Sequence, residues 1–161
     1  LEILEEWLRA HTPAKEVRGI IHGDVGTPNM MFKAGPPARL AAMIDWELST
    51  IGDPMIDMGW FTGGMRDERF PDLTNAAGLN DPTEFPTRQE LMRYYAAGTG
   101  RDPGELDYFT LLAAFKSSCL LEYKVAQAEA GILSRETGRF FARIVDESLK
   151  KNSELVKRIS R

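Results

Sequence analysis

Hydrophobic residues recur at helical spacing at both ends of the chain. The first stripe ends at Pro13, which cannot continue a helical hydrogen-bond ladder, so the pattern predicts a helix over residues 1–11. A second stripe near the other end predicts a terminal helix whose opposite face is charged. The first stripe consists of Leu4, Trp7, Leu8 and His11, and the second of Phe141, Ile144, Val145, Ser148, Leu155 and Ile159.

A longer stripe in the second half of the chain predicts a buried central helix. Its members are Tyr108, Leu112, Phe115, Cys119, Tyr123, Ala126 and Ala130. On this pattern we expect Cys119 to act as a small hydrophobic side chain in the core. Another helix is expected from Thr87 to about residue 97.

Three short apolar runs, at residues 19–21, 29–32 and 40–44, are separated by turns that contain glycine and proline. They predict strands that are too short for a large sheet, so we expect small antiparallel ribbons that position the loops at their ends. Asp53, followed by proline, favours the start of a helix over residues 54–62, because aspartate caps free amide groups and proline suits the first helical position.

Residues 63–86 are rich in Gly, Pro, Asn and Asp, and their length predicts a lid or a specificity loop. Arg66 and Arg69 in this loop form either a solvated face or a pair of guanidinium groups that grips an anionic acceptor such as a CoA ester. Lys150 and Lys151 are interpreted as a solvated helix face. Three aromatic residues are expected in the core, with the lining of an acceptor pocket as the alternative: Trp46, Trp60 and Phe61.

The composition is that of a single globular domain. The chain has 161 residues, of which 43% are hydrophobic, and a formal net charge of −4. Because it has no net positive field, nucleic acid is not expected as a partner. Cys119 is the one cysteine, no apolar run approaches the ~18 to 20 residues of a membrane span, and no signal peptide is recognisable, so we expect a cytoplasmic protein.

Polar residues cluster where the predicted strands end. Asp24 follows the first strand, Asn29 lies at the second and Asp45 ends the third. Two carboxylates and an amide held on loops of a rigid scaffold can converge on one cation, and Mg²⁺ prefers such hard oxygen ligands together with water and phosphate. Cys or His pairs at ligand spacing, which zinc would require, are absent from the sequence. A nucleotide-phosphate site is therefore the hypothesis.

The same residues form a recognisable set of motifs. His22, Asp24 and Asn29 have the spacing His-x-Asp-x-x-x-x-Asn, Asp45 lies in Ile-Asp-Trp-Glu, and Asp57 ends Gly-Asp-Pro-x-x-Asp. In this combination the chain resembles the aminoglycoside phosphotransferase and choline kinase group of protein-kinase-like enzymes, over about residues 18–62. Within that region, residues 45–54 are most similar to the kinase domains associated with acyl-CoA dehydrogenases.

The resemblance implies an α+β fold, namely the predominantly helical carboxy-terminal lobe of a protein-kinase-like phosphotransferase with short antiparallel β-ribbons. This lobe spans residues 1–161. The family's amino-terminal nucleotide-binding lobe, with its glycine-rich cover and its Lys–Glu pair, has no counterpart before residue 18. That lobe is the expected partner, and without it we expect weak nucleotide binding and negligible transfer, since half of the positioning groups are absent.

The resemblance also implies roles for single residues. Asp24 would be the catalytic carboxylate that orients the acceptor hydroxyl and takes its proton. Asn29 and Asp45 would hold the magnesium ions that bridge the phosphates of ATP or GTP. Met31 and Ile44 would form the apolar floor beneath the nucleotide base.

Supporting positions follow from the same motifs. His22 would brace the catalytic loop, and Asp57 would reach back to hydrogen-bond it. Glu47 is either an outer metal ligand or a solvated acid, and Asp53 is interpreted as a helix cap. One departure from the family concerns Gly26, because many relatives have a basic side chain there that touches the transferred phosphate.

These implications predict an enzyme that moves the terminal phosphoryl group of ATP or GTP to a hydroxyl of a small molecule. The acceptors that the family offers are aminoglycosides, choline-like alcohols, sugars and hydroxyacyl-CoA thioesters, of which the last is favoured by the link to acyl-CoA dehydrogenases. One alternative is a non-catalytic, nucleotide-binding regulatory module. Another is a metal-dependent phosphohydrolase, which would normally need more His and carboxylate ligands than a chain with two histidines supplies.

Overall fold

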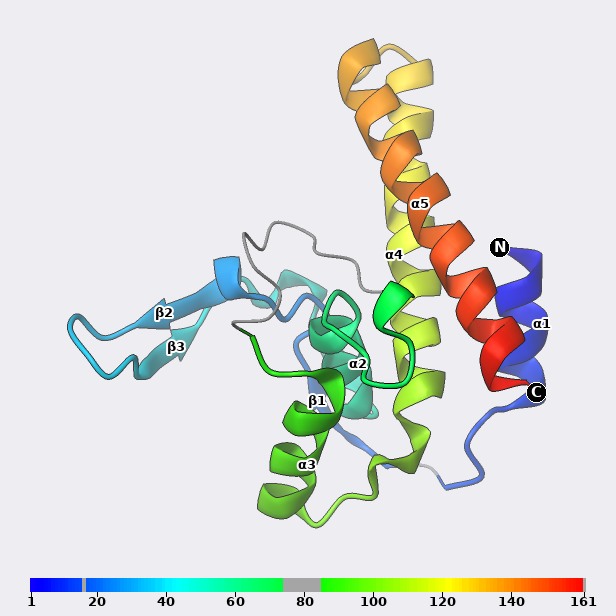
Figure 1. Ribbon diagram of the computed structural model, residues 1–161. Helices are drawn as coiled ribbons and strands as arrows, with labels where there is room; N and C mark the ends of the chain where they lie inside the picture. Colours follow the sequence, from blue (N-terminus) through cyan, green and yellow to red (C-terminus); the bar gives the residue numbers. More distant parts are fainter. Residues whose placement is uncertain (16, 74–84, 161) are drawn as a thin grey trace.

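The computed structural model describes residues 1–15, 17–73 and 85–160 (Figure 1). Most of the described chain is helical, in α1 (Glu2–Ala10), α2 (Met55–Thr62), α3 (Arg88–Thr99), α4 (Leu106–Glu129) and α5 (Arg135–Ile159). Four short strands complete the fold, β1 (Gly19–Ile21), β2 (Met30–Phe32), β3 (Leu40–Met43) and β4 (Thr50–Gly52). The expected α+β class with a helical majority and small antiparallel ribbons is confirmed.

The helices α4 and α5 form a long antiparallel hairpin, and α1 packs against both of them near the chain ends (Figure 1). Helices α4 and α5 approach each other closely at Gly138 of α5, where a Cβ would lie 2.6 Å from the Cβ of Ala128 of α4. The core of this part joins Leu8 of α1 to Leu111 of α4 and Leu155 of α5. The stripes predicted for α1 and α5 therefore face the core as expected, except that His11 is exposed just after the end of α1.

Helix α2 packs directly on α4. A Cβ at Gly59 would lie 2.3 Å from the carbonyl oxygen of Phe109, so only glycine allows this approach. A second core cluster, Met55, Met92, Leu106 and Phe109, joins α2 and α3 to the start of α4. Helix α3 begins at the expected place, because Thr87 and Glu90 form a reciprocal capping box.

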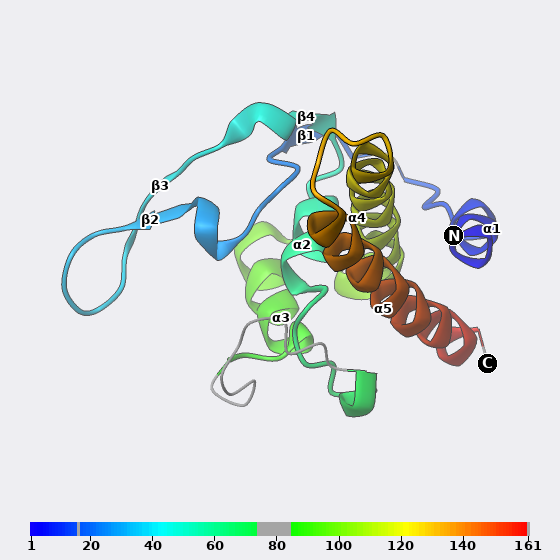
Figure 2. The same cartoon turned by 90° about the horizontal axis from the view of Figure 1, so that it is seen from above.

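The strands form two separate antiparallel pairs. Strand β1 pairs with β4, with Ile20 opposite Ile51, and β2 pairs with β3, with Met31 opposite Ala42. The β2–β3 ribbon extends away from the helices in both views (Figure 2). Strand β4 was not predicted, because its sequence, Thr-Ile-Gly, has one large apolar residue and so contains no apolar run.

The predicted core face of α4 is wrong in its second half. Cys119 and Tyr123 are exposed, whereas Thr110, Ala113 and Ser118 are buried. The first half of the stripe lies half-buried against the core clusters. The error has a physical cause: α2 and α5 cover different sides of α4, so its apolar residues do not form one narrow stripe.

None of the helices in the described ranges combines the length and the apolar character that crossing a bilayer requires. Residues 74–84 of the predicted lid lie outside the described residues. Its described beginning holds a short 3₁₀ turn, Pro71–Leu73.

Candidate active site

The loop that follows β1 is fixed to α2 by one carboxylate. Asp57 accepts the backbone N–H of His22 at 2.7 Å with one oxygen and that of Gly23 at 2.9 Å with the other. Two amide donors on one carboxylate define both the position and the orientation of the loop. Asp57 therefore makes the contact to this loop that the sequence motif predicted.

His22 connects the same loop to the end of β3. Its side chain is buried, with 3% of its surface exposed, and its ring lies 4.7 Å from the Trp46 ring. Nε2 lies 2.8 Å from the carbonyl oxygen of Ile44, and Nδ1 accepts from the backbone N–H of Asp24 at 3.3 Å. A carbonyl can only accept and an amide N–H can only donate, so these contacts require the tautomer with its proton on Nε2. Both ring nitrogens are thus engaged in holding the loop.

Gly23 allows the loop to turn tightly against the segment after β3. Its φ is +85°, and a Cβ would lie 2.4 Å from the carbonyl oxygen of Leu48. Its own carbonyl oxygen accepts a hydrogen bond from Nζ of Lys116 on α4, whose ammonium lies 5.0 Å from the centre of the Trp60 ring. The predictions from sequence did not include Lys116, because it is more than ninety positions from the motif and has no distinctive neighbours.

Asp24 and Asn29 are in direct contact. The Asn29 amide nitrogen donates to the backbone carbonyl of Asp24 at 2.9 Å and to its carboxylate at 3.2 Å. Both residues are half-buried. Because the nitrogen is used in this way, the amide oxygen is the atom of Asn29 that can accept or coordinate something else.

Asp45 is brought beside this pair by the β2–β3 ribbon. The backbone N–H of Ile44 donates to the carbonyl of Asn29 at 3.0 Å, so Asp45 directly follows a residue that is bonded to Asn29. With φ 64° and ψ 57°, Asp45 is the one non-glycine residue of positive φ among the described residues. Such a backbone costs free energy and is typical of functional sites. Glu47 lies exposed in the following 3₁₀ turn, Trp46–Leu48.

The donor set fits magnesium better than a metal held by protein ligands alone. Within residues 1–15, 17–73 and 85–160, no group of three or more His, Cys, Asp or Glu side chains could hold an ion. The residues at hand supply the amide oxygen of Asn29 and the carboxylate of Asp45, next to Asp24. Mg²⁺ is usually bound by one or two carboxylates together with water and substrate phosphates, so the residues present fit this ion.

Met31 and Ile44 lie on the same face of the β2–β3 ribbon. Met31 is opposite Ala42, and Ile44 is two residues beyond Ala42, where side chains return to the same face. The Met31 side chain is 53% exposed and that of Ile44 is 44% exposed. The ribbon therefore presents an uncovered apolar surface next to Asn29 and Asp45.

Asp53 makes the predicted capping contact and also forms an ion pair. Its carboxylate accepts the backbone N–H of Met55 at 2.9 Å, which is the expected capping contact. The same carboxylate also forms two hydrogen bonds with the guanidinium of Arg101, at 2.8 and 2.7 Å. This bidentate pair ties the start of α2 to the segment after α3, and it raises the pKa of Arg101.

A network of ion pairs includes Arg69, for which one interpretation was the binding of an anionic acceptor. Arg69 donates to both oxygens of Asp107, at 2.8 and 2.7 Å, and also to Asp67. Arg88, whose side chain is 4% exposed, donates to Asp67 at 3.0 Å. The hypothesis that Arg69 grips an anionic acceptor is wrong, because its guanidinium is held by two carboxylates. The interpretation of Lys151 as solvated is also wrong, because it is largely buried and donates to the carbonyl of Gly63 at 2.9 Å.

The network keeps Asp67 ionised. Burial alone would raise the pKa of Asp67, but hydrogen bonds from Arg69 and Gln89 and the charge of Arg88 outweigh burial and lower this pKa to about 2. Burial lowers the pKa of Arg88, and the charges of Asp107 and Asp67 oppose that change. The segment after α2 is therefore anchored to α3 and α4 by paired charges.

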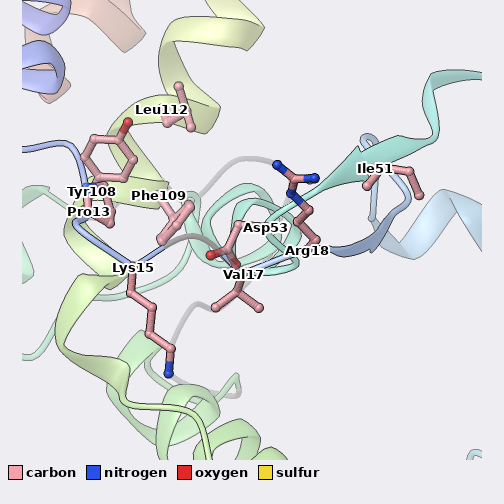
Figure 3. Close-up of a pocket in the computed structure, with 10 residues that line it drawn as sticks. Pro13, Lys15, Val17, Arg18, Ile51, Asp53, Tyr108, Phe109 and Leu112 are labelled. Atoms are coloured by element: carbon pink, nitrogen blue, oxygen red, sulfur yellow. The ribbon is translucent and has the colours of Figure 1, made fainter.

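A cavity of about 470 Å³ lies between the segment before β1, the strand β4 and α4. Figure 3 shows Asp53 between Arg18 of that segment and Phe109 of α4. Because the Asp53 carboxylate is paired with Arg101, its charge is already balanced. The walls of this cavity contain none of the candidate residues from the loops after β1, β2 and β3.

Residues 1–108 match the model of the phosphotransferase enzyme family. Acyl-CoA dehydrogenase family member 11 of Gallus gallus is 30% identical over 166 residues, which cover 98% of this chain and 21% of that protein. The Homo sapiens protein of the same name is 28% identical over 161 residues, with 98% and 20% covered. The chain thus spans about a fifth of the length of these relatives.

A similar solved structure comes from Ralstonia eutropha JMP134 and is provisionally assigned as an aminoglycoside phosphotransferase. It superposes with a TM-score of 0.79 at 25% sequence identity, and the match covers 98% of this chain and 48% of that chain. Together these matches confirm the resemblance that the motifs indicate and the kinase-like fold class.

Proposed function

The chain belongs to the phosphotransferase enzyme family, and from this premise we propose that it is the carboxy-terminal lobe of an enzyme that transfers the terminal phosphoryl group of ATP or GTP to a hydroxyl of a small molecule. One observation supports this proposal above all. Asn29 bonds to Asp24 through its side chain and to Ile44, the neighbour of Asp45, through its backbone. Asp24 and Asn29 of one loop are thus bonded to each other and to the residue before Asp45 in the next loop, which supports a phosphate-transfer centre here.

Asp24 is the proposed catalytic residue. Its carboxylate accepts the proton of the acceptor hydroxyl while the hydroxyl oxygen bonds to the terminal phosphorus. The bond from that phosphorus to its bridging oxygen breaks, and the nucleoside diphosphate leaves with the bonding electron pair. The hydrogen bond from Asn29 holds one oxygen of Asp24 at 3.2 Å and so fixes the direction of the other.

Asn29 and Asp45 are the proposed metal ligands. When bound, magnesium neutralises negative charge on the phosphates of the nucleotide. The backbone hydrogen bond from Ile44 to Asn29 supports this pairing, because it joins Asn29 to the residue that precedes Asp45. Glu47, exposed on the next turn, stays a second candidate as an outer ligand, with a solvated acid as the alternative.

His22 and Asp57 are proposed as positioning residues. Asp57 holds the backbone of the catalytic loop from α2, and His22 joins that loop to the residue before Asp45. Together they fix the relative position of Asp24 and Asp45. Catalysis of phosphoryl transfer depends chiefly on such positioning and on charge stabilisation.

The exposed apolar face of the β2–β3 ribbon is proposed to receive the nucleotide base on Met31 and Ile44. The amino-terminal lobe of the same protein would cover this face from the other side. Because the chain spans about a fifth of its relatives' length, we propose that the carboxy-terminal lobe alone, residues 1–161, binds nucleotide weakly and transfers no phosphate. Acceptors related to hydroxyacyl-CoA are favoured, since the relatives named above are acyl-CoA dehydrogenase family members.

The test is transfer of radioactive terminal phosphate from ATP to a panel of hydroxylated metabolites by the full-length protein. Asp24→Asn should lower kcat at least ~100-fold and leave nucleotide affinity within a few-fold, because the substitution removes the proton acceptor and keeps the shape of the side chain. Asp146→Asn, on the exposed face of α5, is the matched control. An unchanged kcat in Asp24→Asn would remove that residue from the mechanism.

A regulatory module that binds nucleotide without transfer is the second candidate, and Gly26 is the observation that favours it. A Cβ there would meet nothing closer than Pro28 at 3.5 Å, so packing does not require glycine at this position. The absence of a basic side chain there weakens phosphate contacts. Magnesium-dependent nucleotide binding by the full-length protein, without turnover on any acceptor of the panel, would establish this alternative.

A further inference from the structure

A cavity of about 570 Å³ lies between α2, α4 and α5, apart from the residues of the catalytic loop. Its apolar wall includes Trp60 of α2, Leu121 of α4 and Phe140 and Ile144 of α5. Its polar wall includes Ser117 and Lys151. Figure 1 shows α4 beside α5, the next helix of the chain, and α2, which is distant from both in the sequence, packs on α4.

The cavity adjoins the proposed catalytic loop through two side chains. Trp60 forms part of the cavity wall and lies under the ammonium of Lys116. Lys116 in turn donates to the carbonyl of Gly23, the residue before Asp24. Ser117, the next residue of α4, also lines the cavity. The cavity wall is therefore connected to the loop that holds Asp24 by two successive contacts, from Trp60 to Lys116 and from Lys116 to Gly23.

Lys151 gives the cavity wall an uncompensated positive charge. Its ammonium donates to a neutral acceptor, the carbonyl of Gly63, at 2.9 Å. Among the ion pairs of the described residues, none includes Lys151. The nearby carboxylate of Asp67 is already engaged by Arg69 and Arg88. Buried charges in proteins are normally paired, so this ammonium lacks the partner that its burial calls for.

The surroundings of Lys151 favour an anion as that partner. Burial lowers the pKa of Lys151 to about 8, and the charge of Arg88 adds to this effect while that of Asp67 opposes it. The side chain is thus mostly protonated at neutral pH. Arg143 and Glu147 at the rim lie 4.0 Å apart and are both exposed, so they offset one another. Among the charged side chains that line the cavity, the ammonium of Lys151 is therefore the one that is available to bind a ligand.

We propose that this cavity is the acceptor site and that Lys151 binds an anionic group of the acceptor, whose apolar body lies against Trp60 and Phe140. The inference rests on the proposed function, because the acceptor's hydroxyl would receive the phosphoryl group at Asp24. It also defines the substrate class as hydroxylated molecules that have both an anionic group and an apolar segment. A polycationic acceptor would be repelled by the same ammonium.

The test uses probes that differ only in charge. Hydroxyhexanoate, hexanediol and aminohexanol share a hydroxyl and a six-carbon chain, and glycerol phosphate serves as an anion without the apolar segment. Binding to the full-length protein is measured by calorimetry without nucleotide. Hydroxyhexanoate should bind at least ~10-fold more tightly than hexanediol, and aminohexanol should bind most weakly.

Lys151→Met tests the residue itself, with Lys150→Met on the exposed side of α5 as the matched control. Lys151→Met should remove the preference for hydroxyhexanoate and leave the affinity for hexanediol unchanged, whereas Lys150→Met should behave as wild type. Unfolding in urea shows whether each variant is folded. Arg143→Met, at the rim, distinguishes a general effect of positive charge from that of Lys151 and should change affinity less than ~3-fold.

The outcomes separate this inference from the proposed function. Equal binding of all three six-carbon probes, or a preference that persists in Lys151→Met, would overturn the inference even if transfer from ATP is observed. Preference for glycerol phosphate over hydroxyhexanoate would show a phosphate site and overturn the apolar part of the inference. Selective binding of hydroxyhexanoate without transfer to any hydroxyl would uphold the anion site and overturn the proposed function.

Discussion

Asp67→Asn should destabilise the fold strongly, because it removes a buried charge that three side chains depend on. Asp67 accepts from Arg69, Arg88 and Gln89. Its pKa falls from 3.8 to about 2 in the folded state, which corresponds to ~2.4 kcal/mol of stability at neutral pH. Removing one partner of a buried pair also leaves Arg88 partly unpaired, and such changes cost about 3–5 kcal/mol in total.

The assay is urea unfolding with linear extrapolation, at pH 7 and at pH 3. Because the pKa of Asp67 is lowered by folding, its contribution is complete above pH 3.8 and is lost as the pH falls through 2. At pH 3 the wild type should have lost about 1 kcal/mol of the stability that ionised Asp67 contributes. The difference in the free energy of unfolding between the wild type and Asp67→Asn should therefore be smaller by that amount than at pH 7. Asp146→Asn should match wild type at both pH values. A difference below ~1 kcal/mol at pH 7, or one that does not narrow at pH 3, would refute this reasoning.

Three further predictions concern the loop and the cavity. Gly23→Ala should cost about 1–3 kcal/mol in urea unfolding, because of its positive φ and the contact with Leu48, whereas Gly26→Ala should stay within ~1 kcal/mol of wild type. Lys151→Met should raise the free energy of unfolding at pH 7 by about 2 kcal/mol, since the lowered pKa of about 8 means that folding disfavours the charged form of Lys151. This gain in stability should vanish as the pH rises from 8 to 10.5, because the wild type regains stability when Lys151 is neutral in both the folded and the unfolded state. A gain that stays constant over this pH range would contradict the lowered pKa of Lys151. Asp57→Asn should lower kcat at least ~10-fold with a smaller change in KM for ATP, because the loop that holds Asp24 loses one of its two backbone contacts, and equal changes in both constants would exclude a positioning role.

The elements that sequence predicted well are those whose signal is local. Thr87 with Glu90 defines the start of α3 through contacts three residues apart. The α5 stripe predicts its buried face because α4 and α1 both pack on the same apolar side of that helix. The motif from His22 to Asn29 forms a compact loop, so its internal contacts also follow from short spacing.

The features that sequence missed depend on contacts between distant residues. Arg101 bonds to Asp53 across 48 positions, and Lys116 reaches the catalytic loop across 93 positions. No short sequence pattern identifies Arg101 or Lys116, because each basic side chain reaches its hydrogen-bond acceptor only after the helices have packed. Lys151 shows the same limit: it is adjacent to Lys150 in the sequence, but successive residues of a helix project in different directions, so Lys151 lies on the buried side of α5.

The central claim is that Asn29 and Asp45, sixteen positions apart, hold one ion beside Asp24. It is tested most directly by the affinity of the full-length protein for manganese–ATP in a double-mutant cycle of Asn29→Ala and Asp45→Ala. Each single variant should lose at least ~10-fold in affinity, and the double variant should lose little more than either one, because both ligands act on the same ion. Fully additive losses, or unchanged affinity in either single variant, would contradict the claim.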